Sequence, residues 1–250
     1  MSLPETGSLL LGCLAALLVG LSKGGLPAIG MLAVPVMALK IPPVTAAVLL
    51  LPIFVITDAV SVWLYRRDFS RRNVSILIPA GIVGVLFGWA TASYLSDRAV
   101  ALLIGALGVG FCLNSWLRRA PVGDPSPALL GRGLFWGSLA GFTSFVSHAG
   151  APPYQIYVLP QRLAKTTFAG TSTLVFAAIN LAKVLPYMQL RPYSLADLQT
   201  AAWLIPAALA GTVLGAWLTK RIVDRWFFRL VQVGLFAVSC KLIFDAWPWR

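Results

Sequence analysis

The stretch LSKGGLPAIG, residues 21–30, interrupts a segment of the chain that is otherwise almost continuously apolar. Gly24 and Gly25 allow the backbone to leave helical dihedral angles, and Pro27 suits the first turn of a new helix, where its missing N–H would have had no partner. The apolar pieces on either side are each too short to cross a hydrocarbon core of about 30 Å at 1.5 Å per residue. The stretch therefore predicts a re-entrant hairpin, in which two half-helices enter and leave the membrane on the same side.

The composition of the whole chain is that of an integral membrane protein. Of its 250 residues, 58% are hydrophobic and 11% are charged, well below the roughly one quarter that is charged in soluble proteins. At about 20 apolar residues per helical crossing, the chain has room for roughly six to eight crossings and no sizeable soluble domain. The net charge of +12 comes from basic residues clustered between apolar segments, which set orientation in the lipid bilayer. We therefore expect a bilayer as partner and no nucleic acid.

Several classes of bound group are not expected. The sequence holds no phosphate-binding loop of the form G-x-x-x-x-G-K-[ST], so this chain alone is not an ATP-driven pump. Its three cysteines lie far apart in apolar segments, without the spacing of a metal site. We expect no cofactor and no metal.

The two halves of the chain are related in sequence. At an offset of 127, LIPAGIVGVLFGWATASYLSDR (77–98) aligns with LIPAALAGTVLGAWLTKRIVDR (204–225), and the two share proline, glycine and Asp-Arg positions. A second break, in FTSFVSHAGAPPYQIYVLP (142–160), contains Gly150 and two following prolines. Shared breaks and shared spacing predict a duplicated unit.

The positive-inside rule favours an inverted arrangement of the two units. If every apolar segment crosses the membrane, the loop cations divide almost evenly; if both broken segments are hairpins, all but Lys40, Arg98, Arg191 and Arg250 lie on one side. The predicted fold is therefore an all-α polytopic membrane protein of two inverted repeats, each a broken re-entrant hairpin plus three transmembrane helices, with both termini outside. The predicted first repeat is 1–117 (hairpin 8–39, helices 43–64, 74–95 and 99–117), followed by a cytoplasmic linker 118–132 and a second repeat 133–250 (hairpin 133–160, helices 166–188, 199–219 and 227–247).

Two breaks meeting near the midplane would form a site for a small anion. A helix that begins there points unpaired N–H groups and about half a positive charge at the break. Lys23 adds a charge at the first break and His148, the only histidine, lies at the second. Serine and amide side chains nearby could donate to oxyanion oxygens. The predicted substrate-binding residues are Ser22, Lys23, Gly24, Gly25, Ser144, Ser147, His148, Gly150, Gln161, Asn180, Lys183 and Tyr187.

Further ionisable residues lie within the predicted helices. Asp58 aligns with Asn180 at an offset of 122, and Lys183 follows Asn180 by three residues on the same helix face. Because an ionisable group inside a span costs about 2.5–3.5 kcal/mol on insertion scales, we expect Asp58 and Lys183 to pair. The sequence leaves open whether this pair is structural or serves gating or binding, and whether Lys23 faces a substrate or reaches out to water.

Two stretches resemble a known family. GLSKGGLPAIGMLAVPVMAL (20–39) and GFTSFVSHAGAPPYQIYVLPQRLAKTTFAGTSTLVFAAINLAKVLPY (141–187) resemble the signature stretches of the sulfite exporter TauE/SafE family of membrane permeases. The resemblance extends over essentially the whole chain. It implies a bacterial inner-membrane permease for small sulfur oxyanions or organosulfonates, working mostly outward, and it places the two outer termini in the periplasm.

The sequence thus predicts a secondary transporter, not an enzyme, that exports sulfite or a sulfoacetate-like anion by alternating access. Its expected partners are the anionic substrate and the bilayer, and a small body of six crossings also allows a homodimer. Two alternatives stay open. One is an intramembrane hydrolase using Ser144 and His148, which are one helical turn apart but lack a surrounding G-x-S-x-G sequence. The other is a passive anion channel.

Overall fold

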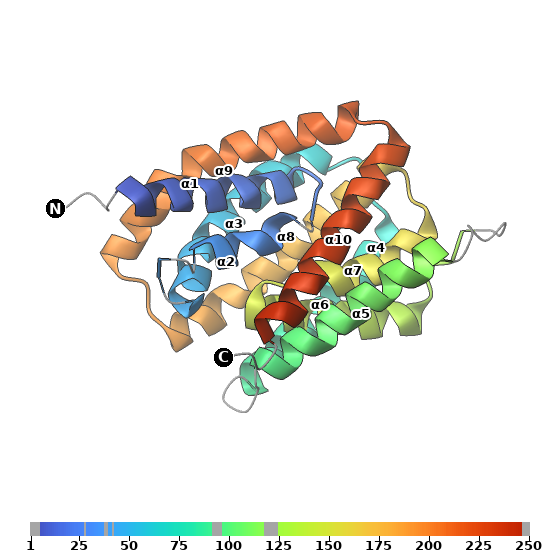
Figure 1. Ribbon diagram of the computed structural model, residues 1–250, viewed down its shortest axis with the longest axis horizontal. Coiled ribbons are helices and arrows are strands. Elements are labelled where there is room, and N and C mark those ends of the chain that lie inside the picture. The colour runs from blue at the N-terminus through green and yellow to red at the C-terminus, as the bar shows by residue number, and fades with distance from the viewer. Residues whose placement is uncertain are drawn as a thin grey trace.

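The computed structural model describes residues 6–27, 29–37, 40–41, 43–91, 97–117 and 125–246. All regular elements within these residues are helical, which confirms the predicted all-α class (Figure 1). In chain order they are α1 (Thr6–Lys23), the 3-10 helix η1 (Ile29–Leu32), α2 (Ala33–Met37), α3 (Pro43–Tyr65), α4 (Arg71–Thr91), α5 (Asp97–Leu117), α6 (Leu130–Ser147), α7 (Ala151–Val158), the 3-10 helix η2 (Leu159–Gln161), α8 (Lys165–Leu190), α9 (Leu195–Arg221) and α10 (Asp224–Ala246).

Five helices among the described residues are long and apolar enough to cross a membrane: α3 from Thr45 onward, α4, α8, α9 and α10. They correspond to five of the six helices that the sequence predicted as spans. The sixth, 99–117, is present as the helix α5. Residues 1–5, 92–96, 118–124 and 247–250, which include the predicted termini and part of the predicted linker, lie outside the described residues.

The distribution of side chains is that of a membrane protein. Large apolar side chains face outward, for example Phe87, Leu185 and Trp203, which are 61%, 71% and 68% exposed. A few charged side chains lie in the interior, among them Lys23 and Lys183, which are only 4% and 0% exposed. Lipid can cover the apolar exterior, whereas ionisable groups inside a span face the bundle interior and mark functional positions.

Both broken segments are interrupted where the sequence predicted. Helix α1 ends at Lys23, the chain turns through Gly25 at a φ of +122°, and η1 and α2 run back against α1 (Figure 1). Helix α6 ends at Ser147, His148 takes a left-handed conformation with φ of 54°, and α7 begins at Ala151 and packs against α6. The chain therefore contains two helical hairpins with irregular tips.

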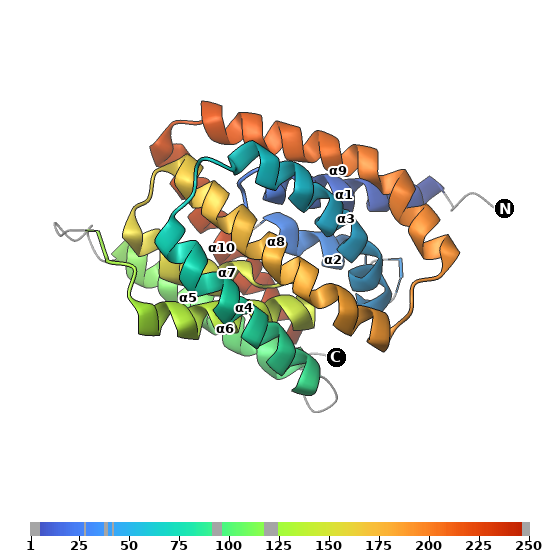
Figure 2. The same ribbon diagram turned by 180° about the vertical axis from the view of Figure 1, so that it is seen from behind.

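The packing between the two halves is symmetric: the most extensive contacts between a helix of the first half and a helix of the second have equivalent contacts between the corresponding helices. Helix α1 packs on α9 and α6 on α4, while α3 packs on α8 and α5 on α10. Figure 2 shows α8 between α3 and α4, both of which it contacts. Small residues allow the close crossings, because a Cβ on Gly20 would collide with the Ala208 backbone and one on Gly141 with the Gly81 backbone. These contacts suit a duplicated unit; the inversion of the repeats and the side of the termini stay predictions.

Candidate functional site

A cavity lies where the tips of the two hairpins meet α3 and α8. It offers about 30 Å³ to the centres of water-sized molecules, and since one water needs about 10–15 Å³ of such space, it has room for about two waters or one small polyatomic ion. Met31 of the first hairpin and Ala149 and Ala151 of the second belong to one buried apolar cluster with Val238 of α10, so the two tips lie close together. Its lining is Ser22, Lys23, Pro27, Gly30 and Met31 from the first hairpin, Ser144, His148 and Ala151 from the second, Phe54 from α3, and Ser172, Thr173, Phe176 and Asn180 from α8.

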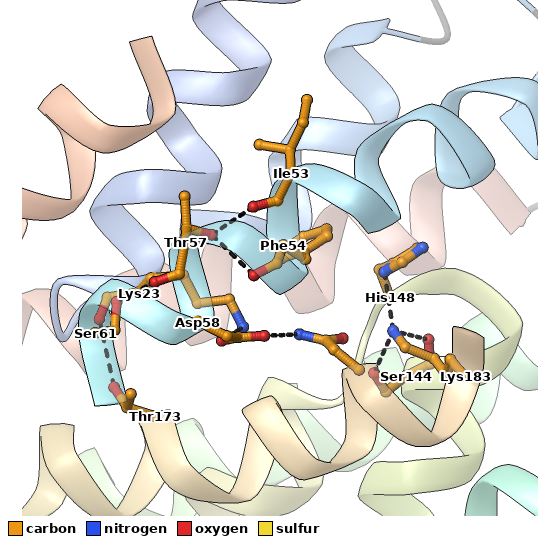
Figure 3. Close-up of polar contacts among 11 residues, drawn as sticks. Lys23, Ile53, Phe54, Thr57, Asp58, Ser61, Ser144, His148, Thr173 and Lys183 are labelled. Carbon is orange, nitrogen blue, oxygen red and sulfur yellow. Dashed lines mark hydrogen bonds and ion pairs between the residues drawn. The ribbon is translucent and has the colours of Figure 1, made fainter. Parts of the chain in front are cut away.

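A buried ion pair joins the first hairpin to α3. The Lys23 Nζ atom lies 2.6 Å from Oδ1 of Asp58, and both side chains are 5% exposed. The other carboxylate oxygen, Oδ2, accepts a hydrogen bond of 2.7 Å from Nδ2 of Asn180 on α8 (Figure 3). The Lys23 ammonium also lies over the ring of Phe54, 5.1 Å from its centroid, a favourable cation–π geometry.

The predicted pair between Asp58 and Lys183 is not the ion pair that forms. Asn180 occupies the side of Asp58 that faces α8, and the tip of the first hairpin brings Lys23 to the other side. Lys183, one helical turn beyond Asn180, is directed to the second hairpin instead (Figure 3).

Lys183 is held at the end of α6 by three contacts. Its Nζ atom lies 3.2 Å from the backbone oxygen of Ser144, 3.1 Å from Ser144 Oγ and 3.1 Å from Nδ1 of His148. The Lys183 side chain is fully buried, so these contacts supply its polar partners within the bundle and tie α8 to the end of α6.

His148 contacts α8 through both ring nitrogens. Nδ1 lies 3.1 Å from Nζ of Lys183, and Nε2 lies 3.3 Å from the hydroxyl of Tyr187. That hydroxyl in turn donates to the backbone oxygen of Phe145 at 2.8 Å. The imidazole is stacked on Phe54, with ring centroids 5.1 Å apart and planes 10° apart. These contacts fix the position of the imidazole in the cavity wall.

Ser144 and His148, the two residues of the hydrolase alternative, both contact Lys183: Ser144 Oγ and His148 Nδ1 each lie 3.1 Å from its Nζ atom.

Several predicted site residues support the cavity without lining it. The oxygen of Gly24 accepts from Tyr65 Oη at 2.6 Å and from Thr219 Oγ1 at 3.0 Å, which fixes the first tip. Gly25 forms the turn itself. Gly150 immediately precedes α7, and a Cβ added to Gly150 would crowd the ring of Phe176 and the backbone of α6. The side chain of Ser147 lies outside the described residues.

Gln161 is not brought to the cavity. Its amide group exchanges two hydrogen bonds with that of Asn73 at the start of α4, at 2.8 and 3.1 Å. Its Nε2 atom also donates to the backbone oxygen of Tyr157. Gln161 therefore ties η2 to α4, and its polar atoms are already occupied.

The helix N-termini contribute less charge than the sequence suggested. Helix α7 begins with Ala151, Pro152 and Pro153, and the two prolines carry no N–H. Helix α2 has only five residues and follows a 3-10 turn. The helix N-termini therefore add little positive charge, and the cationic side chain in the cavity wall is Lys23.

Eight lining residues were not among the predicted site residues: Pro27, Gly30, Met31, Phe54, Ala151, Ser172, Thr173 and Phe176. A signal for two of them exists, because Thr171-Ser172-Thr173 is a polar run inside an apolar span. Phe54 precedes Asp58 by one helical turn, so it shares that face of α3.

Comparison with known proteins gives one family. The family model described as "Sulfite exporter TauE/SafE" matches residues 11–242, a range that contains both hairpin tips and the whole cavity lining. No curated protein and no solved structure matches the chain.

Proposed function

Because the chain belongs to the sulfite exporter TauE/SafE family, we propose that it exports small sulfur-containing anions, such as sulfite or sulfoacetate-like organosulfonates, across the bacterial inner membrane. The family indicates a membrane permease for sulfite or related anions. The range of substrates, the outward direction and the identity of the membrane are what the proposal adds.

The observation that carries this proposal is a cavity with a lysine ammonium in its wall, inside an apolar helical body. Lys23 uses one side of its ammonium on Asp58, and an ammonium has three N–H bonds to give. The hydroxyls of Ser22, Ser172 and Thr173 also line the cavity. Charge-assisted and neutral donors around a small space are what a sulfur oxyanion with several acceptor oxygens requires.

The origin of the lining residues supports a proposal of alternating access. Both hairpins and α8 share one cavity, so a tilt of either hairpin against α8 would open it toward one side. The apolar cluster of Met31, Ala149, Ala151 and Val238 is the place where the two tips would slide. A membrane potential that is negative inside favours anion efflux by about 2.3 kcal/mol per charge per 100 mV, so export needs no coupling ion.

The direct test is flux from liposomes that contain the purified protein. We expect efflux of sulfite and sulfoacetate, no movement of potassium, and faster efflux when unlabelled substrate is present outside. This acceleration separates a transporter from a passive channel. Flux of simple cations, no anion flux, or cleavage of a substrate without flux would contradict the proposal.

A paired substitution tests the role of the Lys23 ammonium. Lys23→Met alone would leave Asp58 buried without its partner, which destabilises a protein whatever the function. We therefore compare Lys23→Met/Asp58→Asn, which removes both charges, with Lys241→Met/Asp245→Asn, which does the same to an exposed pair on α10. We expect the first to lower sulfite flux by about tenfold or more, the loss of one charge-assisted hydrogen bond, and the second to leave it unchanged.

A further inference from the structure

We propose that Gln155, a buried residue of α7, binds the transported anion when the second hairpin moves away from the first; this inference rests on the proposed function. It adds a polar binding position one helical turn beyond the cavity. Two observations carry it: an amide side chain without hydrogen bonds, and the place of that side chain on the helix that leads away from the cavity.

The amide group of Gln155 is buried without a partner. The residue is 0% exposed, and neither Oε1 nor Nε2 has a hydrogen-bond partner. A buried amide that gives up its hydrogen bonds to water without replacing them costs free energy. Such groups are few in native structures, and each one calls for a function or a bound molecule. The amide of Gln155 therefore stabilises nothing in this arrangement of the helices.

The neighbouring polar side chains show what a structural role looks like. Gln161, on η2 of the same hairpin, exchanges two hydrogen bonds with the amide of Asn73. The two tyrosines of α7, Tyr154 and Tyr157, each donate to a backbone oxygen. The structure describes every residue of α7, and among them only Gln155 has a polar side chain without a hydrogen bond.

Gln155 lies one turn behind the cavity on α7. It follows Ala151 by four residues, so the two share a face of the helix. Ala151 lines the cavity and belongs to the apolar cluster with Met31 and Val238, whereas Gln155 is not among the lining residues. A movement that parts this cluster would therefore make Gln155 the next polar group that an anion meets along this face of α7.

The direction of α7 indicates which side of the membrane this position serves. The helix begins at the cavity and leads to η2, after which the chain carries Arg162 and, at the start of α8, Lys165. The positive-inside rule makes a cation-rich end cytoplasmic. An exported anion must reach the cavity from that side. Gln155 thus lies between the cavity and the side from which the substrate arrives.

An amide suits a position that an anion passes through. The Nε2 atom of Gln155 has two N–H bonds to donate and carries no charge. It can therefore hold oxyanions of one or of two charges, and it holds them less tightly than a lysine ammonium does. Binding on a conduction path must allow release as well as entry. Water that enters with the anion would supply the partner that Oε1 lacks.

Gln155→Met tests this role because methionine keeps the length of the side chain and removes the amide. In proteoliposomes at a sulfite concentration below the KM, we expect flux to fall about tenfold, mainly through a higher KM. Thermal unfolding in detergent should show an unchanged or higher midpoint, because an amide without partners is lost. The matched control is Ser239→Ala. The Ser239 hydroxyl is also buried without a partner, but it lies against Gly108 of α5, so flux and KM should stay unchanged.

The outcomes separate this inference from the proposed function. An unchanged KM and flux in Gln155→Met would overturn the inference and leave anion export intact. A lower unfolding midpoint with an unchanged KM would overturn it as well, because it would show a structural amide. Absence of anion flux in the unmodified protein would overturn the proposed function and this inference with it.

Chemical labelling gives a reading that does not depend on transport. Gln155→Cys is made in a chain whose native cysteines, Cys13, Cys112 and Cys240, are replaced by alanine. The probe is an anionic sulfonatoethyl methanethiosulfonate reagent, which reaches a fully buried position only when the helices part. We expect labelling in membranes, slowed about tenfold by saturating sulfoacetate, and none of Ser239→Cys in the same background. No labelling of Gln155→Cys, or a rate that sulfoacetate leaves unchanged, would overturn the inference.

Discussion

Tyr65 and Tyr187 each donate a hydrogen bond to a backbone oxygen at the end of a broken helix. Tyr65 bonds the oxygen of Gly24 at 2.6 Å, and Tyr187 bonds that of Phe145 at 2.8 Å. The last carbonyl groups of a helix have no partner within it, and inside a membrane no water replaces that partner. The two tyrosines stand 122 positions apart, the same offset that relates Asp58 to Asn180. The same structural problem is thus solved twice by one type of residue.

The two tyrosine contacts should differ in their importance for stability. In Tyr65→Phe, Thr219 still donates to the oxygen of Gly24, so we expect a small loss of about 0.5–1.5 kcal/mol. In Tyr187→Phe, the oxygen of Phe145 and Nε2 of His148 both lose a contact, so we expect a larger loss, about 1–3 kcal/mol. Thermal unfolding in detergent measures both, with the outward-facing Trp203→Phe as control. The reverse order would show that the tyrosines do not cap the breaks.

Gly25 should tolerate no side chain. Its φ of +122° is rarely adopted by other residues, and a Cβ would lie 2.5 Å from Oγ1 of Thr219. We expect Gly25→Ala to lower the free energy of unfolding by about 1–3 kcal/mol. Gly110→Ala is the matched control, because a Cβ there meets nothing within 4 Å and alanine favours a helix interior by roughly 0.5–1 kcal/mol. Equal effects of the two substitutions would contradict a strained turn at the first tip.

The Lys23–Asp58 pair should show strong coupling in a double-mutant cycle. Removing one partner leaves an uncompensated buried charge, at a cost of about 3–5 kcal/mol. We therefore expect Lys23→Met and Asp58→Asn each to destabilise the protein more than Lys23→Met/Asp58→Asn does. Chemical unfolding of the four proteins gives the coupling energy. Additive effects would mean that the two side chains do not form the pair.

Gln161 provides a test between a binding role and a structural one. Its amide is engaged with Asn73, so we expect Gln161→Ala to lower stability by about 1–3 kcal/mol and to leave the KM for sulfite unchanged. Asn73→Ala should have the same effect, and the double variant should cost little more than either alone. If Gln161→Ala instead raised the KM for sulfite and left stability normal, Gln161 would belong to the substrate site, as the sequence predicted.

The helix breaks could be read from the sequence because their causes are local. Glycine and proline change the backbone only in their own stretch, and the length of an apolar run sets the length of a membrane-spanning helix. The predicted helix 43–64 therefore agrees closely with α3, Pro43–Tyr65. Helix α9 begins earlier than predicted, at Leu195, because Ser194 and Asp197 form a capping box before the apolar run. That signal was present in the sequence but was not used.

The partners of the polar side chains could not be read in the same way. Lys23, Asn180 and Lys183 were all predicted to lie at the site, yet which of the two lysines faces Asp58 depends on how both hairpins dock against α8. Gln161 was expected to donate to an anion, but Asn73, 88 positions away, satisfies it instead. Periodicity places a residue on a face of its helix, while the choice among nearby acceptors is made only by tertiary packing.

The anchoring of the first tip also sets an order for biogenesis. The backbone oxygens of Lys23 and Gly24 accept hydrogen bonds from Thr173 and Thr219, which lie 150 and 195 positions later in the chain. A ribosome that has released only the first half has not yet made either threonine. The earliest segment to enter the bilayer can therefore gain Asp58 and Tyr65 as partners early, whereas its hydrogen bonds from Thr173 and Thr219 form only when translation is nearly complete.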